Sequence, residues 1–104
     1  MAQERRLEIP TYIPMTERCN CVKGARLLNP TLPRIPSADA LTPNTDAEVG
    51  AFALFNYHGI PHIGVVMYKD GIVPIIGSTN KRACQFTLEP LRPDDPSFRG
   101  FYKP

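Results

Sequence analysis

Two segments of the chain hold residues that could act together as a nucleophile and its base. Cys21 stands at the start of a stretch with helical spacing, and His62 stands at the start of an apolar stretch. A thiol attacks a carbonyl only as thiolate, which the unpaired N–H groups and positive dipole end of a helix favour. The same amides can receive the oxyanion that forms. The sequence therefore predicts thiol-based hydrolysis, with Cys21 as nucleophile and His62 as general base.

A third polar residue is needed to orient the imidazole. Asp70-Gly71 is a strong hairpin signal, so the following strand should return its far end to the level of His62. That end carries Ser78 and Asn80. The amide oxygen of Asn80 can accept from an imidazole N–H, which makes Asn80 the first choice as orienter and Ser78 the second.

Other uses of the cysteines and histidines remain open. Cys19 is an alternative nucleophile, Cys84 is expected in the core, and His58 is expected to be a loop residue. Zinc could also be held by a set of cysteines and histidines, namely Cys19, Cys21, His58, His62 and Cys84. However, the Cys-x-Cys spacing is tighter than that of the usual zinc knuckle. Three tyrosines could line a groove, but burial is the expectation for all of them: Tyr12, Tyr57 and Tyr68.

One main helix is predicted near the N-terminus, over 21–28. Asn20 can cap it, the apolar residues from Val22 to Leu28 fall on one side, and Asn29-Pro30 ends it. An extended arm, 1–15, precedes the helix. A proline-rich surface loop, 30–46, follows it, with room for one helical turn around 37–41.

The second half of the chain has the pattern of an antiparallel sheet. Candidate strands cover 49–57, 62–68, 72–76, 84–88 and 98–102, and the first is apolar on both sides, as in a buried central strand. In the second, Ile63, Val65 and Met67 should point one way and His62, Gly64, Val66 and Tyr68 the other. The expected fold class is α+β, with one main N-terminal helix packed on an antiparallel sheet of about five strands.

Composition narrows the functional class. The chain has 104 residues, enough for one domain, and its net charge of +2 comes from scattered basic residues, which argues against nucleic-acid binding. No apolar stretch predicts a signal peptide or membrane insertion. Three cysteines leave at least one thiol unpaired, and synthesis in a reducing cytoplasm makes structural disulfides unexpected.

The motifs resemble those of the CHAP family, the cysteine, histidine-dependent amidohydrolases/peptidases related to NlpC-type and papain-like enzymes. The similarity lies in the segments beginning at Asn20-Cys21-Val22, at Asp46 and at His62-Ile63-Gly64, and in the ending Arg99-Gly100-Phe101-Tyr102. It covers 16–104 as a single domain and implies a papain-like fold. The resemblance implies the roles of nucleophile for Cys21, base for His62 and orienter for Asn80, without any cofactor or metal.

The function implied is hydrolysis of amide bonds in bacterial peptidoglycan, by an amidase or endopeptidase of phage lysis or of a phage tail. Synthesis in the host cytoplasm would be followed by action at the cell wall or periplasm, after lysis, export or virion assembly. The partners would be peptidoglycan and possible virion proteins. The alternative is a non-catalytic structural or cell-wall-binding virion component. Gly24 and Ser78 favour it, because the family usually has an aromatic and an acidic residue there.

Overall fold

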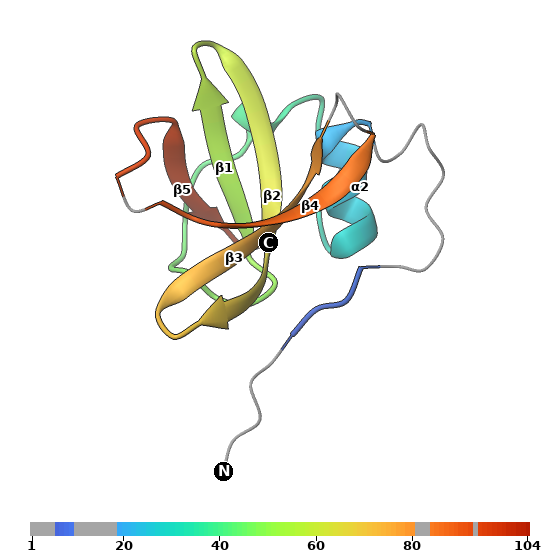
Figure 1. The fold of residues 1–104 in the computed structure, drawn as a ribbon. Coiled ribbons are helices and arrows are strands. Elements are labelled where there is room, and N and C mark those ends of the chain that lie inside the picture. The colour runs from blue at the N-terminus through green and yellow to red at the C-terminus, as the bar shows by residue number, and fades with distance from the viewer. Residues whose placement is uncertain (1–5, 10–18, 81–83, 93) are drawn as a thin grey trace.

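The fold is a small, strongly curved antiparallel sheet with one short helix (Figure 1). This computed structural model describes residues 6–9, 19–80, 84–92 and 94–104. Strands make up 43% of the described residues and helices 13%. The prediction of an α+β papain-like fold with a main N-terminal helix is therefore wrong. Twelve prolines restrict helix formation, and strands make up most of the regular secondary structure among the described residues.

Four strands follow one another as hairpins, and the fifth returns to the first. In chain order they are β1 (Phe52–Tyr57), β2 (Ile60–Asp70), β3 (Val73–Asn80), β4 (Gln85–Pro90) and β5 (Phe98–Tyr102). Their order in the sheet is β4-β3-β2-β1-β5, with every pairing antiparallel. The predicted hairpin at Asp70-Gly71 is confirmed, since it joins β2 to β3 and Gly71 has a φ of 63°.

The turn between β1 and β2 is shorter than predicted. His58 and Gly59 have φ values of 53° and 90°, and the flanking residues Tyr57 and Ile60 already pair. Two consecutive residues with positive φ match the right-handed twist of a two-residue hairpin. As a result β2 begins two residues before His62, which lies inside the strand ladder.

The short helix α2 (Cys21–Leu28) has the predicted bounds. The side chain of Asn20 caps it, and Asn29 donates its backbone N–H to the carbonyl of Ala25 at the other end. Ala25 and Leu28 are buried against the sheet, and the helix contacts β2 and β3. The loop after α2 contains the single 3₁₀ turn η1 (Ala38–Ala40), where a helical turn was predicted.

Apolar side chains form a cluster on each face of the sheet. The larger cluster lies under α2 and η1 and comprises Ala25, Leu28, Leu32, Ala38, Leu41, Phe52, Leu54, Ile63, Val65 and Met67. The smaller one lies on the opposite face and comprises Ala51, Ala53, Phe55, Val66 and Ile76. We call these two faces the helix face and the far face.

Tyr68 is on a different face from the one predicted. The ladder between β2 and β3 shifts register between Val66 and Tyr68, so the alternation of side chains is interrupted there. Tyr68 consequently packs against the helix-face cluster, where the centre of its ring lies 4.2 Å from the guanidinium carbon of Arg6.

Of the predicted arm, 1–15, the structure describes only residues 6–9. In this segment the Leu7 N–H donates to the carbonyl of Met67.

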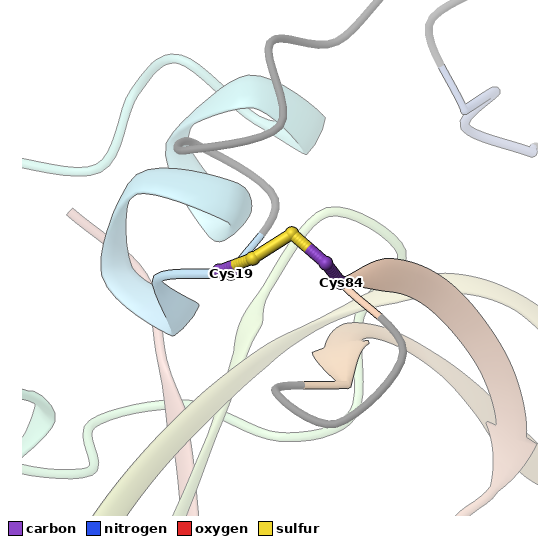
Figure 2. The surroundings of a disulfide bond; sticks show 2 residues. All are labelled: Cys19 and Cys84. Atoms are coloured by element: carbon purple, nitrogen blue, oxygen red, sulfur yellow. A yellow bond between two sulfur atoms is a disulfide. The ribbon is translucent and has the colours of Figure 1, made fainter.

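A disulfide joins the start of α2 to the start of β4 (Figure 2). Cys19 and Cys84 have Cα atoms 4.6 Å apart and are separated by 65 residues in the chain. This corrects the prediction that structural disulfides are absent, which rested on the compartment of synthesis. It also corrects the placement of Cys84, which is half-buried in the turn before β4 with a φ of 53° and is not a core residue.

The outer side of β5 is paired with the loop before β1. Asn44 and Lys103 exchange two hydrogen bonds of 2.8 Å through the Asn44 side chain. The backbone N–H groups of Asn44 and Thr45 both donate to the carbonyl of Phe101. Among the described residues, no helix is long and apolar enough to cross a membrane.

Candidate functional site

Cys21 is the free cysteine of this chain and occupies the first position of α2. It is half-buried and lines a cavity of about 400 Å³ on the helix face, between the start of α2, the η1 turn and the start of β2. The residues around this cavity are Cys19, Asn20, Cys21, Val22, Pro36, Ser37, Ala38, Ile60 and Pro61. The predicted nucleophile therefore has both the helix position and the access that its chemistry needs.

The amides of the first turn of α2 are mostly in use. The Asn20 side-chain oxygen accepts from the N–H groups of Val22 and Lys23 at 3.0 and 3.1 Å. The N–H of Gly24 donates to the carbonyl of Asn20 at 2.7 Å. Nothing in the described part of the chain accepts from the N–H of Cys21 itself. That one amide, rather than the whole helix start, is what this structure offers to an oxyanion beside the thiol.

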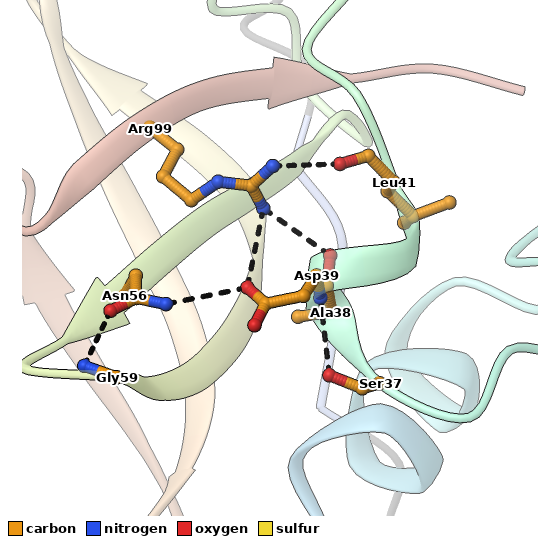
Figure 3. Close-up of polar contacts among 7 residues, drawn as sticks. All are labelled: Ser37, Ala38, Asp39, Leu41, Asn56, Gly59 and Arg99. Atoms are coloured by element: carbon orange, nitrogen blue, oxygen red, sulfur yellow. Dashed lines mark hydrogen bonds and ion pairs between the residues drawn. The ribbon is translucent and has the colours of Figure 1, made fainter.

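A polar network holds the η1 wall of the Cys21 cavity against the sheet (Figure 3). Arg99 of β5 donates to the carbonyls of Ala38 and Leu41, at 3.3 and 2.9 Å. Its guanidinium also lies 3.9 Å from the carboxylate of Asp39, which accepts from Asn56 of β1 at 3.5 Å. Three separate segments of the chain are thus joined beside the cavity. No local spacing in the sequence connects these residues, so the sequence alone does not predict the network.

His62 lies on the far face of the sheet. It is directly opposite Phe55 in the β1–β2 ladder, whereas the next pair is Leu54 and Ile63. Opposed residues of an antiparallel pair share a face, and neighbours along a strand alternate. Phe55 belongs to the far-face cluster, and Leu54 and Ile63 to the cluster under α2. The side chains of His62 and Cys21 are therefore on opposite faces of the sheet.

The two predicted orienters are on the same face as His62. Ser78 lines a far-face cavity together with His62. Asn80, at the end of β3, is two residues further along, so it shares that face and is exposed. The last pair of the β2–β3 ladder is Val65 with Gly77. If this register is continued by three residues on each strand, Asn80 lies opposite His62. The structure thus brings the predicted base and orienters together, but not the nucleophile.

The remaining cysteines and His58 do not assemble a metal centre. Cys19 and Cys84 are bonded to each other, which removes Cys19 as an alternative nucleophile and both residues as thiolate ligands. His58 is exposed in the β1–β2 turn. No group of three histidine, cysteine, aspartate or glutamate side chains close enough to hold a metal occurs among the residues that the structure describes.

A second cavity, of about 270 Å³, lies on the far face between the sheet and the segment that follows β4. It is lined by Phe55, Tyr57, His62, Ile76, Ser78, Glu89, Pro90, Leu91, Arg92 and Asp95. The prediction that Tyr57 is buried is wrong, since 42% of this residue is exposed. Partial burial raises the pKa of Tyr57, and its hydrogen bond with Ser97 opposes that rise.

Comparison with known proteins found no relative of this chain. No family model matches the chain, and no curated protein or solved structure matches it. Function is therefore inferred from the two cavities and from the residues that line them.

Proposed function

We propose that this chain is a thiol hydrolase of bacterial peptidoglycan amide bonds, with Cys21 as the nucleophile. The observation that carries the proposal is the position of the free Cys21 thiol, at the first residue of α2 and in an open cavity. In this reaction the thiolate attacks the amide carbonyl, and the amine leaves with a proton. Water then hydrolyses the thioester, which returns the thiol.

Two further features support this proposal. The Cys21 N–H has no acceptor among the described residues and, at the first position of α2, can donate to an oxyanion that forms beside the thiol. The Cys19–Cys84 disulfide is typical of proteins that work in oxidising surroundings, which agrees with action at a cell wall. The CHAP resemblance of the sequence supplies the substrate class.

This mechanism needs a general base near the Cys21 thiol. A general base must come within hydrogen-bond reach of the proton that it removes, and His62 lies on the far face, away from Cys21. Ile60 and Pro61, which immediately precede His62, do line the Cys21 cavity. The proposal therefore requires the β1–β2 hairpin to rearrange at this end, so that the imidazole turns towards the thiol.

A pH series of thiol alkylation tests the pairing of Cys21 with His62. The rate of reaction with iodoacetamide follows the thiolate fraction, and Cys21 is the free thiol of the chain. If His62 acts on the thiol, the profile of the His62→Ala variant will move to higher pH than that of the parent. His58→Ala is the matched control, because His58 is exposed in the neighbouring turn, and its profile should equal the parent's.

Turnover is tested on purified peptidoglycan, by measuring new amino groups. The parent should release them, and the Cys21→Ser variant should be slower by about a hundredfold or more. Equal rates for the parent and the Cys21→Ser variant would contradict the assignment of the nucleophile.

A second candidate function is non-catalytic binding to the cell wall. The observation in its favour is the separation of Cys21 from His62 and Asn80 by the sheet. This function predicts that the parent sediments with peptidoglycan but releases no amino groups, and that Cys21→Ser sediments equally well.

A further inference from the structure

The far-face cavity shares two lining residues with a second hollow, around Tyr57. This hollow, of about 340 Å³, is lined by Asn56, Tyr57, His58, Asp95, Pro96 and Ser97. Tyr57 and Asp95 line both hollows and therefore stand between them. Each hollow is near the lower end of the size range of small-molecule sites, so each suits one ring of a ligand rather than a long chain.

A fixed aromatic wall forms one side of the far-face cavity. The rings of Phe55 and Tyr57 are stacked, with centroids 5.7 Å apart and planes within 8°. His62 lies against both, at 5.9 and 6.0 Å, and Phe98 supports Phe55 from the neighbouring strand at 5.5 Å. Because each ring is held by another, the exposed part of Tyr57 is a pre-formed flat surface that loses little conformational entropy when a ligand binds.

The two hollows, which together we call the sugar groove, also contain fixed hydrogen-bonding groups from the segment that follows β4. One oxygen of Asp95 accepts from the N–H of Ser97 at 2.9 Å and also from its hydroxyl. These hydrogen bonds with Ser97 lower the pKa of Asp95, so its carboxylate is ionised at neutral pH. Its other oxygen has no hydrogen-bond partner in the described ranges and remains able to accept. Glu89 and Arg92 add two further charged groups.

The combination selects one class of ligand. An aromatic face packs against the C–H face of a sugar ring, and carboxylates accept from several hydroxyl groups of the same ring. The two carboxylates of Glu89 and Asp95 exceed the one guanidinium of Arg92, so the groove carries net negative charge and disfavours phosphates. We propose that this groove binds a neutral disaccharide, with one sugar ring in each hollow and Tyr57 between them.

This inference does not rest on the proposed function, because Cys21 lies on the helix face. A hydrolase without the sugar groove and a sugar-binding protein without hydrolase activity would give different results. Release of amino groups tests the first, and equilibrium binding of a sugar that contains no peptide tests the second.

The experiment is a titration of the full chain, followed by amide chemical shifts in solution. The probes are diacetylchitobiose, cellobiose and, as a peptide of similar size, acetyl-trialanine amide. We expect a disaccharide to shift the amide signals of residues 55–58 and of the non-proline residues 89, 91, 92, 94, 95 and 97. Absence of shifts with both sugars, shifts only around Cys21, or binding of the peptide alone would overturn the proposal.

Three variants separate stacking from general effects on the fold. Tyr57→Ala should weaken binding by about tenfold or more, whereas Tyr57→Phe keeps the ring and should stay within about threefold of the parent. Leu88→Ala is the control, because Leu88 is 46% exposed and is next to Glu89 but on the other face of β4. It should bind as the parent does.

A further variant leaves the stacked rings intact and tests the groove even if Tyr57→Ala fails to fold. Asp95→Asn retains the side-chain shape and an acceptor for Ser97 but removes the charge, and it should weaken sugar binding by about threefold or more. Unchanged affinity in both Tyr57→Ala and Asp95→Asn, with normal thermal unfolding, would contradict the proposed groove.

Discussion

The Cys19–Cys84 disulfide predicts a large and measurable contribution to stability. It closes a loop of 65 residues, and cross-linking a loop of that length removes about 15 cal/mol/K of entropy from the unfolded chain. At room temperature this corresponds to about 4 kcal/mol in the free energy of unfolding. Unfolding of a domain of this length changes entropy by about 0.2 kcal/mol/K. The double variant Cys19→Ser/Cys84→Ser should therefore melt about 20 °C below the parent.

The assay is thermal unfolding followed by far-ultraviolet circular dichroism, for the parent, the double variant and Cys21→Ser. The last is the matched control, because it removes a sulfur two residues from Cys19 but leaves the cross-link, and it should change stability by less than about 1 kcal/mol. Alkylation of the unfolded, unreduced parent should modify one cysteine only. Melting of the double variant within a few degrees of the parent would contradict the stabilising effect of the cross-link, and alkylation of three cysteines in the parent would contradict the disulfide itself.

Three smaller predictions concern single side chains. Asn20→Ala removes the cap of α2 and should lower the free energy of unfolding, measured in urea, by about 1 kcal/mol, whereas Asn20→Asp should change it little. The hydroxyl of Thr79 is buried without a hydrogen-bond partner in the described structure, so the isosteric Thr79→Val should raise the free energy of unfolding by about 1 kcal/mol; a loss would argue that the hydroxyl is bonded. The hydrogen bond from Lys103, and then its charge, lower the pKa of Glu48. The stability from this pair is present above the pKa of the unfolded carboxyl and disappears as the pH falls through the folded value. An NMR titration should show the pKa of Glu48 rising in Lys103→Met.

Local signals in the sequence were sufficient for the short elements. Asn20 and Asn29-Pro30 determine both ends of α2 through backbone capping and the restriction before proline. Asp70-Gly71 determines the β2–β3 hairpin because Gly71 adopts the positive φ that the turn needs. Each of these effects acts within a few residues and does not depend on the rest of the fold.

Which residues the fold brings together at the site could not be predicted from such local signals. The alternation along β2 already put His62 and Ile63 on opposite faces, but both faces of β1 are apolar. The pattern alone therefore could not show which face α2 would cover. α2 covers the face on which Ile63 lies. Because neighbouring side chains along β2 alternate between faces, His62 lies on the other face, away from Cys21. The disulfide depends on the meeting of two segments far apart in the chain, and no local pattern encodes that meeting.

The pairing of the loop before β1 with β5 affects how copies of this chain meet one another. A strand at the edge of a sheet offers free N–H and C=O groups, on which the strand of another molecule can add. Here Asn44 and Thr45 already engage the carbonyl of Phe101, and the Asn44 side chain engages Lys103. The outer edge of β5 is therefore occupied at Phe101 from within the same chain. This loop protects the folded protein from strand-to-strand aggregation at β5.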